Sequence, residues 1–406
     1  MAHALSFSQT VQAPPELVYR HFANASLLEY WLAERAYVHA EVGGVIFLNW
    51  DTDNYYAAGS YTTLSPGQAI AFSWYGSGEP APSQVEVAFE AVDGGTLVKL
   101  THSKLGEGDE WATTLEGLKS NWVTYLENLK SILEEGKALR LYNRPLMGVF
   151  PSEFVTAAMA QEEGLPYSSG AKISGVLPDT GAEAAGLQGG DVINMINAIE
   201  ITDWGAIGRA VEGKLPGDEV ALVFHRGTER HEVSLALSQR PFPDVPDSFD
   251  GMAAKLQTEQ ADFIAELEAF LAEISAEEAA QQPAEKAWSV NQNLAHLILN
   301  ERATQQYIHN EEQDVAGSTY IANDAYMIDA LIDVLGDSKE LLAEFKRATS
   351  QTAAMVRRFP EALVKRRGPY IYIGQILQGL VGHNQQHLAQ MKDVIAALRG
   401  EAAVEA

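Results

Sequence analysis

The sequence predicts a multidomain α+β protein whose three parts differ in hydrophobic periodicity. Its 406 residues exceed one typical domain, at about 100 to 200 residues per domain. Alternating apolar residues indicate strands in the first two parts, whereas the last part shows helical spacing. Three prolines in residues 241–246 mark a linker, because proline interrupts helices and sheets. We therefore expect domains at 1–140, 141–240 and 248–400.

Composition excludes several classes of function. The chain has no cysteine, which rules out catalytic thiols, disulfides and cysteine-ligated metals. Its formal net charge of −27 opposes binding to phosphate backbones and anionic membranes. No apolar run reaches the roughly 18 residues of a membrane span, and the amino-terminal segment lacks the pattern of a signal peptide. We expect a cytoplasmic protein that binds neither nucleic acid nor membrane.

Residues 1–140 are expected to form a curved antiparallel sheet wrapped on one long helix. A stretch with helical spacing runs from Leu17 to Trp31, and apolar residues then alternate with polar ones through several strands. The final apolar stripe, from Leu115 to Leu133, repeats at i, i+3, i+4 and i+7 and therefore predicts a helix. Gly136 is a plausible glycine just beyond its carboxyl end.

This first part resembles the SRPBCC superfamily, the START-like helix-grip fold, in the branch related to the activator of the heat-shock chaperone ATPase. The segments that carry the resemblance are APPELVYRHFANASLLEYWL, EVGGVIF, SPGQAIAFSWYG and VEVAFEAVDGGTLVKLTHSKL, followed by the helix around Trp122. The resemblance implies a cavity for a small apolar molecule between sheet and helix. Six aromatic residues are its candidate lining: Trp50, Phe72, Trp74, Phe89, Trp122 and Tyr125.

The alternative is that these aromatic side chains simply fill the core. No carboxylate pair or His–Ser arrangement points to chemistry in this part of the sequence. Regulation of the chaperone ATPase is a further possibility that rests on family likeness alone.

Residues 141–240 predict a small β-rich module. Short strands are expected at 172–176, 192–196, 219–224 and 230–237, separated by turn residues, with one short helix near Trp204. The run AAGLQGGDVINMINAIEI resembles the signature of PDZ domains in the circular order of bacterial HtrA-like proteases. No Ser/His/Asp set of a protease accompanies it.

The PDZ resemblance implies a site for the carboxyl end of a protein or peptide. Such a domain adds the peptide as a strand at a sheet edge, and backbone N–H groups of one loop receive the terminal carboxylate. The matching loop is Leu146, Met147, Gly148 and Val149, where glycine allows close backbone approach. Pro151 departs from the pattern because it removes a ladder donor. The alternative is a groove that is empty or filled by a helical insert at 151–168.

Residues 248–400 predict a bundle of four long helices. The first carries the apolar stripe from Met252 to Ile274, and Ser289 to Gln292 form a capping-box pattern that opens the second. The third is expected from about Ala325 to Phe359, with a break at Gly336, and the fourth from about Ile371 to Leu398.

Two of these helices carry histidines at positions suited to a metal. His383 and His387 are four residues apart and therefore share one helix face, which is chelate spacing. His296 lies two turns into the second helix, with Asn293 and Asn300 on either side. Neutral imidazole is a common ligand of zinc, nickel and iron. His309 is expected to be a solvated residue instead.

The helical part resembles the DinB-like superfamily of four-helix bundles, through Trp288–Ser289, His296 and the last-helix pair. The resemblance implies a divalent metal, Zn, Ni or Fe, held by His296, His383 and His387. Hydrolysis and thiol transfer on a small molecule are then both chemically available. No catalytic base is assigned, since Glu301 points about 140° away from His296 on an ideal helix. The residues leave open whether the chain is an enzyme or a non-enzymatic binding scaffold.

Overall fold

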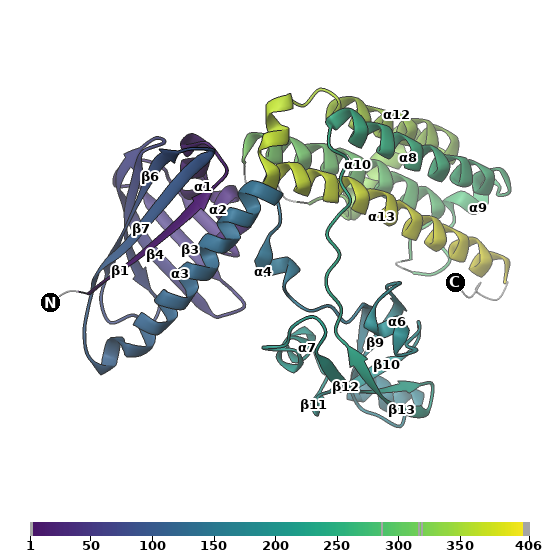
Figure 1. The fold of residues 1–406 in the computed structure, drawn as a ribbon. Coiled ribbons are helices and arrows are strands. Elements are labelled where there is room, and N and C mark those ends of the chain that lie inside the picture. Colours follow the sequence, from purple (N-terminus) through teal and green to yellow (C-terminus); the bar gives the residue numbers. More distant parts are fainter. Residues whose placement is uncertain (1–2, 286, 316, 318–319, 401–406) are drawn as a thin grey trace. The chain divides into compact units, whose positions relative to one another are not determined.

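The computed structural model describes residues 3–285, 287–315, 317 and 320–400. The chain divides into two compact units, one of Met1–Lys137 with Pro243–Ala406 and the other of Ala138–Phe242. The first unit contains an antiparallel sheet domain and a helical bundle, and the second is rich in strands (Figure 1). This content confirms the predicted α+β class. No helix in these described ranges is both long and apolar enough to cross a membrane.

The sheet domain has seven strands in the order β1-β7-β6-β5-β4-β3-β2. Their bounds are β1 (His3–Val11), β2 (Arg35–Val38), β3 (Val45–Trp50), β4 (Tyr55–Ser65), β5 (Ala69–Gly76), β6 (Ser83–Val92) and β7 (Gly95–Leu105). The helices are α1 (Pro15–Ala23), α2 (Ala25–Trp31) and α3 (Asp109–Glu135). The long helix α3 lies against the sheet (Figure 1), as the sequence predicts.

Local sequence explains where these helices end. The predicted helix from Leu17 to Trp31 is interrupted at Asn24, whose side chain accepts a hydrogen bond from the Leu27 N–H and so caps α2. Helix α3 ends at Gly136, whose φ of 75° is left-handed. A Cβ at Gly136 would collide with the Arg367 carbonyl and Ile371, so glycine is also needed for close packing.

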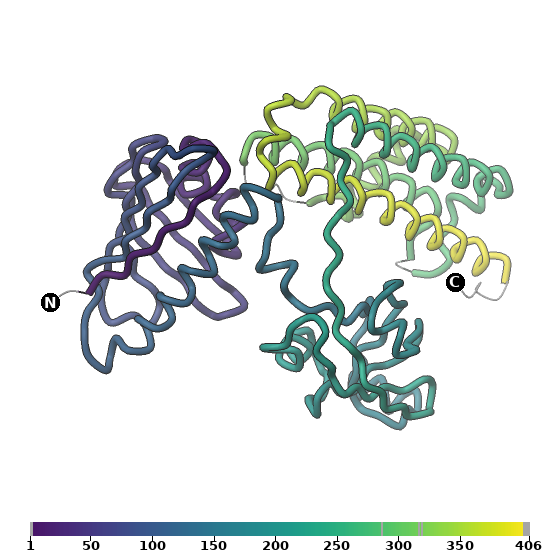
Figure 2. The backbone as a smooth tube through the Cα atoms, in the orientation of Figure 1, coloured from purple at the N-terminus to yellow at the C-terminus, as the bar shows by residue number. Residues whose placement is uncertain are grey.

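The bundle contains four long helices that run side by side (Figure 2). They are α8 (Phe249–Ala272), α10 (Val290–Gln313), α12 (Ser338–Val356) and α13 (Arg367–Arg399), with short α9 (Ala276–Ala280), α11 (Ala325–Leu335) and a 3-10 turn (Glu361–Lys365) between them. The predicted capping box at Ser289 and Gln292 is present. Gly336, with a φ of 90°, separates α11 from α12. The last helix begins at Arg367, four residues before the predicted Ile371.

The second unit is a sheet in the order β13-β12-β10-β9-β8, with β11 paired to β10. Its strands are β8 (Val149–Val155), β9 (Gly170–Val176), β10 (Val192–Ile196), β11 (Ile199–Glu200), β12 (Glu219–Arg226) and β13 (Glu229–Ala236). Its helices are α4 (Leu139–Tyr142), α5 (Ala157–Glu163), α6 (Gly181–Ala184) and α7 (Trp204–Ala210).

The expected helical insert at 151–168 is wrong in its first part. Residues 149–155 form strand β8, and only Ala157–Glu163 are helical. The strand tolerates Pro151 because it lies at the end of the sheet order and its register shifts on both sides of the proline.

Candidate metal centre

Three histidines converge in the middle of the bundle. His296 comes from α10, and His383 and His387 come from successive turns of α13. The His383 Nε2 lies 3.2 Å from the Nε2 of His296 and 3.2 Å from that of His387. One ring nitrogen from each residue lies within 4.8 Å of the other two. Ligands of a tetrahedral zinc, at about 2.0 to 2.1 Å from the metal, are separated by roughly 3.3 Å, so the spacing fits a cation.

Neighbouring groups fix the proton position on two of these rings. The Nδ1 of His296 donates to the Ala322 carbonyl at 2.9 Å, and that of His387 donates to the Asn293 Oδ1 at 2.8 Å. The Asn293 amide is itself oriented, because its Nδ2 donates to the Ser289 carbonyl. In a neutral ring with a protonated Nδ1, the Nε2 keeps its lone pair. Two lone pairs therefore face the centre.

The third ring, His383, is coupled to Asn300 and Tyr320. The Asn300 Nδ2 lies 3.3 Å from the His383 Nδ1, and the Tyr320 hydroxyl donates to the Asn300 Oδ1 at 2.9 Å. In this arrangement the His383 Nε2–H points at the other two Nε2 atoms. A metal bound at the His383 Nε2 requires that the ring proton be on Nδ1 instead. If the Asn300 amide were reversed, its Oδ1 would accept a hydrogen bond from this Nδ1–H. Each of the three rings thus has an Nδ1 partner: the Ala322 carbonyl, the Asn293 amide or the Asn300 amide.

Burial keeps the three imidazoles neutral. His296 is 1% exposed and His387 is 8% exposed, whereas His383 is partly accessible. Burial lowers the pKa of all three, and burial together with the two neighbouring rings lowers the pKa of His387 to about 3. The Trp288 ring lies over His387, with centroids 6.1 Å apart and planes 18° apart. The accessible side of the cluster is therefore that of His383.

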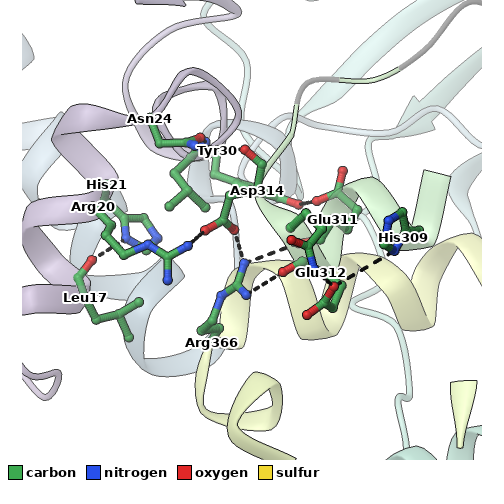
Figure 3. A network of polar contacts seen from close by, with 12 residues as sticks. Leu17, Arg20, His21, Asn24, Tyr30, His309, Glu311, Glu312, Asp314 and Arg366 are labelled. Atoms are coloured by element: carbon green, nitrogen blue, oxygen red, sulfur yellow. Dashed lines mark hydrogen bonds and ion pairs between the residues drawn. The ribbon is translucent and has the colours of Figure 1, made fainter. Parts of the chain in front are cut away.

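His309 and Glu301 are not part of the three-histidine cluster. The His309 side chain is 53% exposed and lies beside Glu312 (Figure 3). Glu301 is completely buried and accepts hydrogen bonds from the Gln260 amide at 3.0 Å and the Thr352 hydroxyl at 2.6 Å. Burial raises the pKa of Glu301 to about 7. Both carboxylate oxygens of Glu301 accept hydrogen bonds from these neutral donors. Glu301 is therefore not part of the metal centre, as the sequence predicts.

The sheet domain gathers most of the six predicted aromatic residues into one cluster. Rings of neighbours lie 5.8 to 6.5 Å apart along the series Phe72, Trp74, Trp122, Tyr125 and Trp50. The sixth, Phe89, lies instead against Tyr19 and Phe22. The buried Glu79 adds a carboxylate to this cluster, since its Oε1 accepts from the Tyr55 hydroxyl and the Trp74 indole.

The structure also pairs a serine with a histidine in this cluster, which the sequence did not indicate. Ser83 Oγ lies 2.7 Å from the Nε2 of His102, and the Trp122 indole N–H donates to the His102 Nδ1 at 3.0 Å. Because Nδ1 accepts, the neutral ring carries its proton on Nε2 and donates it to Ser83. His102 therefore cannot take a proton from that serine, and the pair is structural. Val98, Leu100 and His102 alternate onto the buried face, a signal present in the sequence.

The predicted peptide loop precedes the edge strand of the second unit. Leu146 pairs with Ser238, and Val149 begins β8. Gly148 has a φ of 88°, and a Cβ there would collide with Thr180. Phe154 of β8 contacts Trp204 of α7, with ring centroids 5.3 Å apart. Strand β8 therefore contacts helix α7 through this ring pair.

Two family models match separate parts of the chain. Residues 12–134 match the family described as Activator of Hsp90 ATPase homolog 1-like protein, and residues 258–391 match the DinB superfamily. The solved structure of the Aha1 dimer from Colwellia psychrerythraea is 22% identical, with a TM-score of 0.29, and the match covers 33% of this chain and 98% of that one.

Curated relatives match over about a hundred residues. The Zinc metalloprotease RasP of Shouchella clausii is 32% identical over 115 residues, 28% of this chain and 26% of the relative. A protein of Marinomonas sp. described as "Probable periplasmic serine endoprotease DegP-like" is 36% identical over 113 residues. These residues are 27% of this chain and 24% of the relative. The chain thus spans about a quarter of these proteins. An AHSA1-type match at the amino end, weak similarity to PDZ-containing proteases in the middle and a DinB superfamily match at the carboxyl end fit a three-domain fusion.

Proposed function

We propose that His296, His383 and His387 hold one divalent metal through their Nε2 atoms and that the chain uses it to transform a small molecule. The observation that carries this proposal is the convergence of three Nε2 atoms whose Nδ1 partners lie on the outside of the cluster. A bound divalent metal would supply Lewis-acid activation of water or of a thiol. Hydrolysis and thiol transfer are the two reaction classes that we propose to test. The metal candidates are Zn, Ni and Fe.

The surrounding residues orient the ligands and restrict access. Trp288 covers His387, and the Ala322 carbonyl holds His296 from the loop before α11. A substrate would reach the centre from the His383 side, where Tyr320 and Asn300 lie. Burial raises the pKa of Tyr320, so its hydroxyl stays protonated. A catalytic base from this chain is not assigned.

The proposal is tested by comparing metal-loaded and metal-stripped full-length protein on two substrate panels. One panel measures hydrolysis of esters and amides, and the other measures consumption of a low-molecular-weight thiol with an electrophile. We expect activity on one panel that requires metal and is lost in His383→Ala but kept in His309→Ala. Activity that is equal with and without metal would contradict a metal-dependent reaction.

A second function, binding of a protein tail, is favoured by strand β8. This strand lies at the end of the sheet order, directly follows Leu146 to Gly148 and contacts α7 through the Phe154–Trp204 ring pair. We propose that a peptide pairs with β8 while the loop receives its terminal carboxylate. Binders from a carboxyl-terminal peptide library should weaken when that carboxylate is amidated. If no peptide in the library bound, the second unit would have only a structural role. A non-enzymatic scaffold function would then lose its support.

The sheet domain suggests two further binding partners, an apolar ligand and a chaperone ATPase. We propose that the aromatic cluster around Trp50, Trp74 and Trp122 contacts a small apolar ligand, which quenching of tryptophan fluorescence would detect. Regulation of a chaperone ATPase is the remaining alternative and rests on the AHSA1-type match. An ATPase assay with the added chain tests it.

A further inference from the structure

A pocket of about 550 Å³ lies within the first unit, between the α1 region of the sheet domain and the start of α13. Its lining includes four cationic and two anionic side chains: Arg20, Lys365, Arg366, Arg367, Glu16 and Glu134. Among the lining side chains alone the balance is therefore 4 − 2 = +2, in a chain with a formal net charge of −27. A cationic pocket in such an acidic chain points to an anionic occupant.

Both acidic residues of the lining face other groups. Glu134 accepts a hydrogen bond from the Gln12 backbone N–H at 2.9 Å and pairs with Lys130 on the same helix. The Glu16 carboxylate packs against the turn at Gly67, where a Cβ would collide with its Oε2. Glu134 is thus held by neighbours outside the cationic group, and Glu16 lies against a backbone turn.

Two of the cations are fixed by a single buried carboxylate. Arg20 and Arg366 both donate to Asp314, whose side chain is 1% exposed (Figure 3). Arg366 also donates to the Glu312 carbonyl at 2.7 Å. Burial and the charge of Arg20 lower the pKa of Arg366, whereas the carboxylates of Glu312 and Glu311 act in the opposite direction. The buried Arg366 Nε has no hydrogen-bond partner among the described residues.

The other two cations have no counter-charge in place. Within the described part of the chain, no carboxylate forms an ion pair with Lys365 or Arg367. Both lie at the amino end of α13, whose first turn contains no acidic residue and whose N-cap, Arg366, makes no side-chain capping bond. The amino end of a helix is its positive end, so cations there repel the helix dipole and an anion would relieve the repulsion.

We propose that this pocket binds a small organic oxyanion, whose phosphate or carboxylate groups are held by Lys365 and Arg367. Its volume is in the range of sites for metabolite-sized ligands. The rest of the wall offers apolar contacts for the carbon part of such a ligand: Ala13, Pro14, Leu17, Leu133 and Ala362. This site is formed by residues other than the three histidines, so it stands independently of the metal proposal.

The test is calorimetric titration of the full-length protein with inorganic pyrophosphate and, separately, with citrate. In about 0.1 M salt, at least one probe should bind at a single saturable site with a Kd below about 1 mM. The probe that binds more tightly distinguishes phosphate from carboxylate recognition. The double variant Lys365→Gln/Arg367→Gln should weaken binding at least about tenfold, since it removes charge-assisted hydrogen bonds.

A charge-matched control is Lys119→Gln/Lys339→Gln, which removes two positive charges from exposed positions elsewhere in the first unit. It should keep the affinity of the unmodified chain. Ala362→Glu, which adds a carboxylate to the wall, should also block binding without removing a cation. Equal affinities in the two double variants, or no saturable binding of either probe, would overturn the proposal.

Discussion

Buried histidines occur in both domains of the first unit, and their ring nitrogens are used differently. His102 in the sheet domain has both nitrogens engaged, by Ser83 and by the Trp122 indole. In the bundle, His296 and His387 use only Nδ1 for outside partners and turn Nε2 towards His383. Burial alone therefore does not distinguish a ligand from a core residue. A candidate metal ligand differs from a core histidine in having a ring nitrogen that keeps its lone pair and faces the ring nitrogens of other histidines.

The largest expected effect comes from removing a ligand of the bundle. His383→Ala should reduce bound metal from about one equivalent to below about 0.1, because two imidazoles alone hold a divalent ion weakly. Elemental analysis of the purified variant measures this. His309→Ala is the matched control, since its side chain is 53% exposed, and it should keep the metal. If both variants lost the same amount of bound metal, metal binding would not depend on the clustered histidines.

Replacing the sheet-domain histidine should affect stability instead of metal content. His102→Leu leaves the buried Trp122 N–H without an acceptor, which should lower the free energy of unfolding by about 1 to 3 kcal/mol. Chemical denaturation followed by tryptophan fluorescence measures the change. His39→Leu, at an exposed position, should change it by less than about 0.5 kcal/mol. Loss of metal in His102→Leu would contradict a purely structural role for this histidine.

The pH dependence of stability should differ between His102 and its leucine variant. Burial lowers the pKa of His102 to about 4 from its ordinary value of 6.5. Between these values the unfolded state binds more protons, so stability falls as pH decreases from 6.5 to 4, by up to about 3 kcal/mol for this residue. The unfolding free energy of His102→Leu should fall less over that window. Parallel curves for the two proteins would show that His102 is not buried as a neutral ring.

Removing a partner that orients a histidine ring should weaken metal binding without abolishing it. Asn293→Leu removes the acceptor that orients His387, and metal affinity should fall about 10- to 100-fold. Competition with a chromophoric chelator gives the affinity. An unchanged affinity would mean that the Asn293 contact does not orient the ligand.

The smallest expected effect is that of Tyr320→Phe, which removes only the hydroxyl that contacts Asn300. Metal affinity should fall less than in Asn293→Leu, by about threefold or less, because Tyr320 acts through a second residue. The same chelator competition ranks the two variants. A larger loss in Tyr320→Phe would move this hydroxyl closer to the metal than our scheme places it.

Periodicity in the sequence was sufficient for most of the architecture. The alternating strands, the long helix ending at Gly136 and the break at Gly336 are local properties that the structure confirms. Strand β8 was missed because Pro151 argues locally against a strand, while pairing with β9 decides the outcome. Tertiary pairing, which leaves no local trace, overrode the proline.

The site was predictable only in part. The i, i+4 spacing placed His383 and His387 on one face, and family resemblance added His296. The Ala322 carbonyl and the Tyr320 hydroxyl were not predictable, because they reach the site from a loop whose path depends on the whole bundle. The same holds for the Ser83–His102 pair, which joins two strands.

We propose that three imidazoles of the bundle bind one divalent metal ion. The most direct test of this proposal is elemental analysis of full-length protein that has been supplied with Zn, Ni and Fe and then dialysed. We expect about one equivalent of a single divalent metal per chain. Protein that retains no metal after such loading would contradict it.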